Sequence, residues 1–243
     1  MKSIVNLTLA ITITLLAVSE SHAQWGNKKV VGNGNVTTKT VKTSGYDAIE
    51  GVGSMDIHLQ KGTEGHITVT TDDNLHEYII VEVKNNKLVL KTKKNTNLKT
   101  NKGIHITVPF KDISKVSMVG SGDIDSEDTV KADNLKVYVT GSGDIVLDVE
   151  ANMLKVKITG SGDIELNGTT HDLEVSVSGS GDFSGFGLSA QNTDASVAGS
   201  GDIKVVAKNS IKARVSGSGD ILYKGNPERS DTKTSGSGDI KSY

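Results

Sequence analysis

The sequence predicts an all-β fold: a right-handed parallel β-helix, or β-solenoid, with two sheets and one Gly-Ser-Gly-Asp corner in each coil of 18–21 residues. The first observation behind this prediction is that the tetrapeptide occurs seven times at a regular period, which marks a repeat architecture. The copies begin at Gly120, Gly141, Gly160, Gly179, Gly199, Gly217 and Gly236. The second is apolar alternation around each copy, and the third is a composition with 27 glycines, two prolines and 4% aromatic residues.

The repeat unit alternates with a period of two residues on both sides of each corner. Val156 and Ile158 precede the corner at Gly160, and Ile164 follows it. This period is typical of half-buried strands. Each repeat is therefore predicted as strand, corner, strand and a variable second corner, such as Glu150-Ala151-Asn152 or Gly168-Thr169-Thr170-His171. Glycine suits a sharp reversal because such a turn usually needs a positive φ.

An antiparallel meander would also give strand, corner, strand. The near-constant repeat length favours the solenoid, because stacked coils must share one cross-section. The handedness rule for parallel crossovers makes it right-handed. Seven coils at about 4.8 Å each give a stack of roughly 34 Å.

The two ends of the mature chain differ from its middle. We predict one domain over residues 24–243, with an irregular part at 24–119 and regular repeats at 120–243. The irregular part contains a degenerate copy of the corner, Gly51 to Ile57, and a hairpin from Val81 to Leu90 that turns at Asn85-Asn86. The last coil carries Thr232, Thr234 and Ser242 at inward positions, as expected of a polar terminal repeat.

Residues 1–23 are predicted to be a secretory signal peptide. Lys2 begins it, Leu7 to Val18 is apolar, and Ser21-His22-Ala23 has the small residues that signal peptidase accepts. The mature chain then begins at Gln24, and no other stretch is apolar enough to span a membrane. Cysteine is absent, which excludes disulfides and thiolate sites. We expect an exported product in the periplasm, on the cell surface or secreted.

The chain resembles a known family at several motifs. These are Gly32-Asn33-Gly34-Asn35-Val36, Tyr46-Asp47-Ala48-Ile49, Val108-Pro109-Phe110 and the serial Gly-Ser-Gly-Asp-Ile corners. They are similar to the putative auto-transporter adhesin, head GIN domain family. The resemblance implies a two-sheeted β-helix related to pectin-lyase-like folds, and an exported adhesin. It supplies no catalytic residues to carry over.

Seven equivalent aspartates form the most suggestive polar set. In a solenoid they lie in a column about 4.8 Å apart along one edge; they are Asp123, Asp144, Asp163, Asp182, Asp202, Asp220 and Asp239. Neighbouring carboxylates repel, so the column gains from cations or from hydrogen bonds. We favour aspartates that accept backbone N–H groups as Asx turns, with weak cation binding as the alternative.

No catalytic, cofactor or metal constellation is evident. An enzyme on a β-helix needs clustered carboxylates, whereas these are evenly spaced, and the single tryptophan, Trp25, offers no sugar platform within the repeats. The histidines have no spacing typical of a pair, so we expect surface side chains at His58, His66, His76, His105 and His171. No nucleotide-binding loop or serine nucleophile motif occurs.

Charge is uneven along the chain. Residues 1–119 carry a net charge of +5 and residues 120–243 one of −7. The basic excess is concentrated in Lys84, Lys87, Lys91, Lys93, Lys94, Lys99 and Lys102. We favour solubility and protection of an edge over an anion-binding patch. Nucleic-acid binding is not expected, since aromatic residues do not interleave with these lysines.

The function that fits these features is an exported, non-enzymatic adhesin or cell-envelope binding module. Its partner would be a glycan, an envelope component or a host-surface component. The competing predictions are an enzyme that acts on polysaccharide and a purely structural envelope protein.

Overall fold

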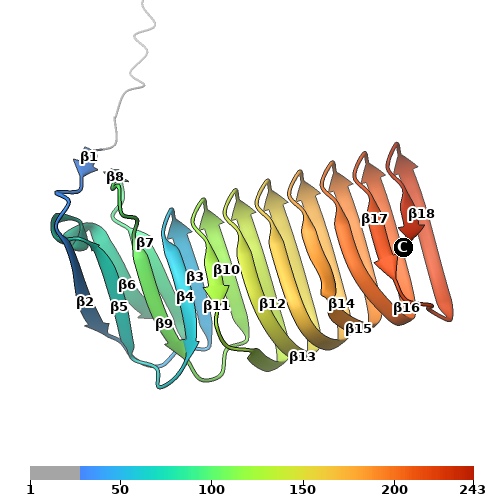
Figure 1. Ribbon diagram of the computed structural model, residues 1–243, viewed down its shortest axis with the longest axis horizontal. Coiled ribbons are helices and arrows are strands. Elements are labelled where there is room, and N and C mark those ends of the chain that lie inside the picture. Colours follow the sequence, from blue (N-terminus) through green and yellow to red (C-terminus); the bar gives the residue numbers. More distant parts are fainter. Residues whose placement is uncertain (1–27) are drawn as a thin grey trace, which may run out of the picture.

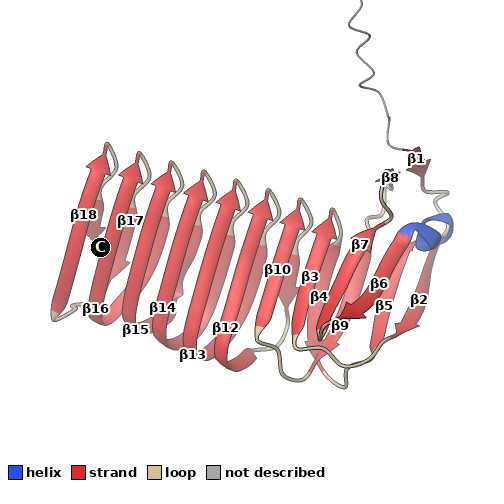
Figure 2. Cartoon of the chain, turned by 180° about the vertical axis from the view of Figure 1, so that it is seen from behind, coloured by secondary structure: helices blue, strands red, loops and turns tan. Residues whose placement is uncertain are grey.

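The protein is a long stack of β-strand coils (Figure 1). A computed structural model describes residues 28–243, in which the one helical element is the short 3₁₀ helix η1 (Asp73–Tyr78). Stacked parallel strands make up the body of the molecule (Figure 2), so the predicted β-solenoid is confirmed. The predicted signal peptide at 1–23 and the start at Gln24 lie outside the described residues.

In the regular half, each full coil is one long strand that ends at a Gly-Ser-Gly-Asp corner. The strands are β10 (Lys115–Gly120), β11 (Ile124–Ser126), β12 (Val130–Gly141), β13 (Ile145–Gly160), β14 (Ile164–Gly179), β15 (Phe183–Gly199), β16 (Ile203–Gly217), β17 (Ile221–Lys224), β18 (Arg229–Gly236) and β19 (Ile240–Ser242). Neighbours pair in parallel and in register, so that Gly141 lies opposite Gly160 and Gly160 opposite Gly179. The predicted period is thus the period of the stack.

The second corner is a bend within a strand, which corrects the sequence prediction. Glu150-Ala151-Asn152 lies inside β13, and Gly168-Thr169-Thr170-His171 lies inside β14. Pairing continues on both sides of the bend, with Ala151 opposite Thr170 and Met153 opposite Asp172. The ladder of backbone bonds to the neighbouring coils keeps the segment extended through the predicted corner.

The strands form two walls that enclose a narrow core. We call the segments that run into the corners the entry wall, and the segments that leave them the exit wall. Inward residues of the entry wall stack in a ladder whose members are at most 3% exposed: Met118, Val139, Ile158, Val177, Val197 and Val215. A facing ladder on the exit wall comprises Ile124, Ile145, Ile164, Phe183, Ile203 and Ile221. Each buried aliphatic side chain contributes about 1.5–3 kcal/mol, so these ladders stabilise the stack.

The irregular part adds strands of both directions to the same stack. Its strands are β1 (Lys28–Val31), β2 (Val36–Lys42), β3 (Ala48–Gly53), β4 (Asp56–Lys61), β5 (His66–Asp72), β6 (Ile79–Lys84), β7 (Lys87–Thr92), β8 (Thr96–Lys99) and β9 (His105–Phe110). β3 and β4 stack directly on β10 and β11, and Gly53 lies opposite Gly120. The degenerate corner copy is therefore a true coil of the solenoid.

Strands β2, β5, β6, β7 and β9 cover the far side of that coil. β7 pairs with β3 and β9 with β4, both in parallel, whereas β2–β5, β5–β9 and β6–β7 are antiparallel. The predicted hairpin is confirmed as β6–β7, and Asn85 and Asn86 at its turn have φ values of 50° and 58°. β1 and β8 form a separate two-stranded ribbon.

The last coil has the predicted polar character. Thr232 lies opposite the buried Ala213, and Thr234 lies opposite the buried Val215. Every residue of β18 is exposed. Hydroxyl groups at these positions can face water at the open end, where an aliphatic side chain would not be covered.

Candidate binding surface

The aspartate column connects the coils at the corner edge. The carboxylate of each aspartate except the last, Asp239, accepts a hydrogen bond from the backbone N–H of the equivalent aspartate in the next coil; Asp163 N–H, for example, donates to Asp144 Oδ1 at 2.8 Å. All six steps from Asp123 to Asp239 are bonded in this way, at 2.7–3.0 Å. Acceptance of backbone N–H groups was predicted correctly, but the donors lie in the next coil, so these are not Asx turns.

Corner backbone groups explain why a carboxylate is needed there. The Gly141 carbonyl accepts two N–H groups of the next coil, from Ser161 at 2.8 Å and from Gly162 at 3.0 Å. The Asp163 N–H then has no backbone acceptor of its own in the coil before it, and the Asp144 carboxylate supplies one. The column therefore completes the ladder across a turn where strand pairing is interrupted.

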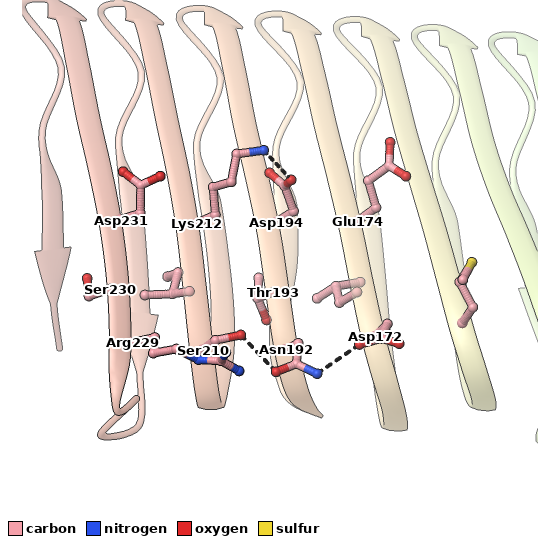
Figure 3. Close-up of a pocket in the computed structure, with 13 residues that line it drawn as sticks. Asp172, Glu174, Asn192, Thr193, Asp194, Ser210, Lys212, Arg229, Ser230 and Asp231 are labelled. Atoms are coloured by element: carbon pink, nitrogen blue, oxygen red, sulfur yellow. Dashed lines mark hydrogen bonds and ion pairs between the residues drawn. The ribbon is translucent and has the colours of Figure 1, made fainter.

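A shallow groove of about 500 Å³ lies on the outer face of the entry wall (Figure 3). It crosses successive coils near the bend, and its polar lining comes from β14, β15, β16 and β18: Asp172, Glu174, Asn192, Asp194, Ser210, Lys212, Arg229, Ser230 and Asp231, with the inward Thr193 beneath. Because the strands are in register, these side chains form columns with a step of about 4.8 Å. We call this feature the entry-wall groove.

The column nearest the bend is a hydrogen-bonded chain of three coils. Asn192 donates from Nδ2 to Asp172 Oδ1 at 2.9 Å, and its own Oδ1 accepts from the Ser210 hydroxyl at 2.7 Å (Figure 3). The Asn192 amide, and secondly the neighbouring His171, hold the pKa of Asp172 below its usual range. The chain fixes which way each amide and hydroxyl points, so the surface presents a defined pattern of donors and acceptors.

A second column pairs opposite charges. Glu174 lies 2.5 Å from Lys155 Nζ, Asp194 lies 2.7 Å from Lys212 Nζ, and Asp231 pairs with Arg214. The Arg214 guanidinium lowers the pKa of Asp231, and the Glu174 carboxylate raises the pKa of Lys155. The groove thus contains four carboxylates, on Asp172, Glu174, Asp194 and Asp231, and each of them has a hydrogen-bond or ion-pair partner.

Sequence reasoning missed this groove because its members stand at variable positions of the repeat. The sequence does carry one signal for the groove, a polar residue at the same register position of four successive coils. These residues are Asp172, Asn192, Ser210 and Arg229. A comparison of the repeats column by column would have found it. The Gly-Ser-Gly-Asp motif instead indicates the corners, which lie at the opposite end of the entry wall from the groove.

Two histidines that were predicted to be unpaired meet on the exit wall. Pairing of β4 with β9 brings His58 Nε2 to 3.4 Å from His105 Nδ1, although 47 residues separate them. His58 Nδ1 lies 2.8 Å from Asp125 Oδ2, and His105 Nε2 lies 3.0 Å from the Lys102 carbonyl oxygen. His105 Nδ1 also lies 3.5 Å from Asp56 Oδ2, and the two rings stack with centroids 5.7 Å apart at 15°. Among residues 28–243, no group of three or more histidine or acidic side chains is arranged to hold a metal ion.

The lysine-rich segment is partly neutralised. Lys84 and Lys91 pair with Glu82 at 2.9 and 2.6 Å, and Lys87 pairs with Glu50 at 2.9 Å. These pairs favour the expectation of a solvated strand face over that of an anion-binding patch at these three positions.

Comparisons with known proteins agree with this architecture. A family described as "Putative auto-transporter adhesin, head GIN domain" matches residues 45–227. No curated protein matches the chain. Over the part that the structure describes, no helix has the length and apolar character needed to cross a bilayer.

Several solved structures share the fold. A putative adhesin from Bacteroides fragilis is 29% identical with a TM-score of 0.82, over 88% of this chain and 100% of its own. A protein from Parabacteroides distasonis described as a putative lipid binding protein is also 29% identical, with a TM-score of 0.76, over 89% of this chain and 100% of its own. A putative adhesin from Parabacteroides merdae, at 22% identity and a TM-score of 0.71 over 89% of this chain and 99% of its own, shows the fold alone.

Proposed function

Because the chain belongs to the putative auto-transporter adhesin, head GIN domain family, we propose that it is an exported, non-enzymatic binding module that attaches to a glycan, an envelope component or a host-surface component. The entry-wall groove is its contact surface. The observation that carries this proposal is the in-register repetition of polar side chains along the groove, from Asp172 to Arg229. A surface that repeats every 4.8 Å or so suits an extended partner held by many weak contacts.

The state of the carboxylates supports binding rather than hydrolysis. A glycosidase needs a protonated carboxylic acid beside a second carboxylate, so the pKa of the acid must be raised. In the groove, the pKa values of Asp172 and Asp231 are instead lowered by Asn192 and Arg214. Glu174 and Asp194 already bond to lysines of neighbouring coils.

The test is retention of an immobilised panel of glycans, envelope fractions and host-matrix proteins by the chain from Gln24 to Tyr243. We expect the double variant Glu174→Gln, Asp194→Asn to lose most of the retention. The matched control is Asp148→Asn, Glu165→Gln, which removes the same charges from exposed positions of the exit wall. Equal retention by both variants would remove the groove from the proposal.

The same panel separates the competing functions. New reducing ends or unsaturated sugars released from a polysaccharide would establish the enzyme instead. Failure to retain any component, with the protein present throughout the envelope fraction, would favour a purely structural role.

A further inference from the structure

The exit wall carries a second exposed feature, formed where the regular register breaks. The pairing of β15 shifts against β14 between Glu165 and Gly168, and against β16 between Ser184 and Ser189. Extra residues of β15 therefore bulge from the wall around Phe186. Bulges change the direction of side chains and are frequent next to functional sites, so this bulge marks a candidate binding site.

The bulge is built to hold an aromatic residue outward. Glycines flank Phe186 on both sides: a Cβ on Gly185 would press on the Phe183 ring, and one on Gly187 would overlap the Asn167 side-chain oxygen. The other two phenylalanines, Phe110 and Phe183, are at most 1% exposed. Phe186, in contrast, lies partly exposed on the outer face.

Two residues from later coils complete an aromatic cluster with Phe186. The Tyr243 ring, on a residue that is 78% exposed, lies 5.6 Å from the Phe186 ring between centroids, at 39°. Lys224 Nζ lies 4.1 Å from the Phe186 centroid and 4.9 Å from that of Tyr243. The ammonium group therefore lies within reach of both rings.

This ammonium group has no carboxylate partner among the described residues, unlike the lysines of the entry-wall groove. Lys204 lies in register between Ser184 and Leu222 on the same face, and is likewise outside the ion pairs of the described chain. A cation without a carboxylate partner beside two aromatic rings stands out in a half of the chain with a net charge of −7.

We propose that Phe186, Tyr243 and Lys224 form a site for an acidic pyranose, a uronate residue of a glycan chain. The C–H face of a sugar ring carries partial positive charge and packs on the negative face of an aromatic ring. The sugar carboxylate meets Lys224, whose charge the two rings already favour. This inference rests on the proposed function as a binding module and names a partner class for a second surface of it.

A glycan fits the cluster better than an acidic peptide. The register neighbours of Lys204 on this face are Ser184 and Leu222, so the coils that carry the cluster also offer an ammonium group and a hydroxyl to a ligand. A peptide anchor would need an enclosed apolar pocket, whereas a sugar needs an open ring face beside polar groups.

The test is calorimetric titration of the chain from Gln24 to Tyr243 with hyaluronan oligosaccharides and with their carboxyl-reduced counterparts. We expect Tyr243→Ala and Lys224→Gln each to weaken hyaluronan binding about tenfold, as loss of one aromatic or charged contact would. Carboxyl reduction of the sugar should weaken its binding to the unmodified protein to a similar degree. Added salt should weaken the binding of unreduced hyaluronan, because it screens the attraction between the carboxylate and Lys224.

Matched controls exist on the opposite wall, where Lys115 Nζ lies 5.1 Å from the centroid of the single Tyr138 ring. Tyr138→Ala and Lys115→Gln should bind hyaluronan as the unmodified protein does. Tyr243 is exposed, so its replacement should leave the melting temperature unchanged and keep the result interpretable even if Phe186→Ala does not fold.

Three results would overturn the site: undiminished binding of the carboxyl-reduced sugar, equal effects of the Tyr243 and Tyr138 variants, or tighter binding of polyglutamate than of hyaluronan. Each is independent of the panel test of the groove. If groove variants lose retention while the Tyr243 and Lys224 variants bind hyaluronan normally, the acidic-sugar site fails and the binding module stands.

Discussion

At the scale of single residues, stacking requires both glycines of a corner, since a Cβ on Gly160 would overlap the Gly141 carbonyl oxygen of the previous coil, and Gly160 has a further constraint in its backbone conformation. Gly160 has φ of 118°, a conformation that side chains disfavour. Gly162 has no such φ, yet a Cβ there would overlap the Gly143 carbonyl oxygen of the coil before it. The expectation that glycine serves only for positive φ was therefore incomplete, because stacking of identical corners also forbids a side chain.

We predict that Gly160→Ala and Gly162→Ala both destabilise the fold, by about 1–3 kcal/mol each, the first through backbone strain and overlap together and the second through overlap alone. Denaturant unfolding measures the effect. Ser161→Ala, between them and exposed, is the control and should change stability by less than about 0.5 kcal/mol. Three equal and small changes would contradict the packing argument.

The aspartate column predicts a contrast between two replacements of Asp163. Asn keeps an oxygen that can accept from the Asp182 N–H and removes one of a row of like charges, so its stability should equal or exceed that of the unmodified protein. Ala leaves the N–H without its acceptor and should cost about 1 kcal/mol. Thermal unfolding with and without millimolar Ca²⁺ completes the test. A melting temperature that rises with Ca²⁺, and stops rising in Asp163→Asn, would instead support the cation alternative.

At the scale of elements, the link between the first coil and the strands that cover it depends on a buried tyrosine. Tyr46, just before β3, donates its hydroxyl to the Pro109 carbonyl in β9. Burial raises the pKa of Tyr46 above the usual value of 10.0. The folded chain therefore keeps this proton when the unfolded chain has begun to lose it, and stability from this group is complete below pH 10 and declines as the pH rises further.

We predict that Tyr46→Phe lowers stability at pH 7 by about 1 kcal/mol, through loss of the hydrogen bond. The variant should also lose less stability than the unmodified protein between pH 9 and about pH 11. Denaturant midpoints across this range measure both effects. Parallel pH profiles would show that folding does not raise the pKa of Tyr46.

The elements also show which predictions a sequence supports. Corner glycines and the large apolar residue after them, isoleucine in six coils and Phe183 in one, predict strand positions and register, since the backbone requires the first and the core the second. The second corner at Asn152 was predicted to separate two strands, whereas the backbone bonds that keep β13 continuous there leave no trace in side-chain type. His58 and His105 meet only through the pairing of β4 with β9, which the spacing of 47 residues does not reveal.

At the scale of the whole molecule, the last coil protects an otherwise open apolar end. β18 covers β16, whose inward Ile211, Ala213 and Val215 are at most 3% exposed. Seventeen strands, from both the irregular and the regular part, belong to one hydrogen-bonded sheet. That residues 24–243 unfold as one domain stays a prediction.

Deletion of residues 225–243 should therefore cause self-association, because it uncovers the inward face of β16 together with its unpaired edge. Light scattering on the purified proteins is the measurement. A deletion of residues 241–243 leaves β18 in place and should scatter light as the unmodified protein does. A monomeric protein after the longer deletion would show that the polar coil is dispensable as a cap.

The in-register joins between corners have a consequence for molecular length. Every coil from β13 to β16 offers the next one the same set of groups: a glycine carbonyl that accepts twice and a carboxylate that accepts once. A coil inserted among them would meet matching groups above and below. The distance between the two ends can therefore change in whole steps of about 4.8 Å, about one for each 19 residues gained or lost, while both end structures stay as they are. The number of corners therefore determines the length of the solenoid.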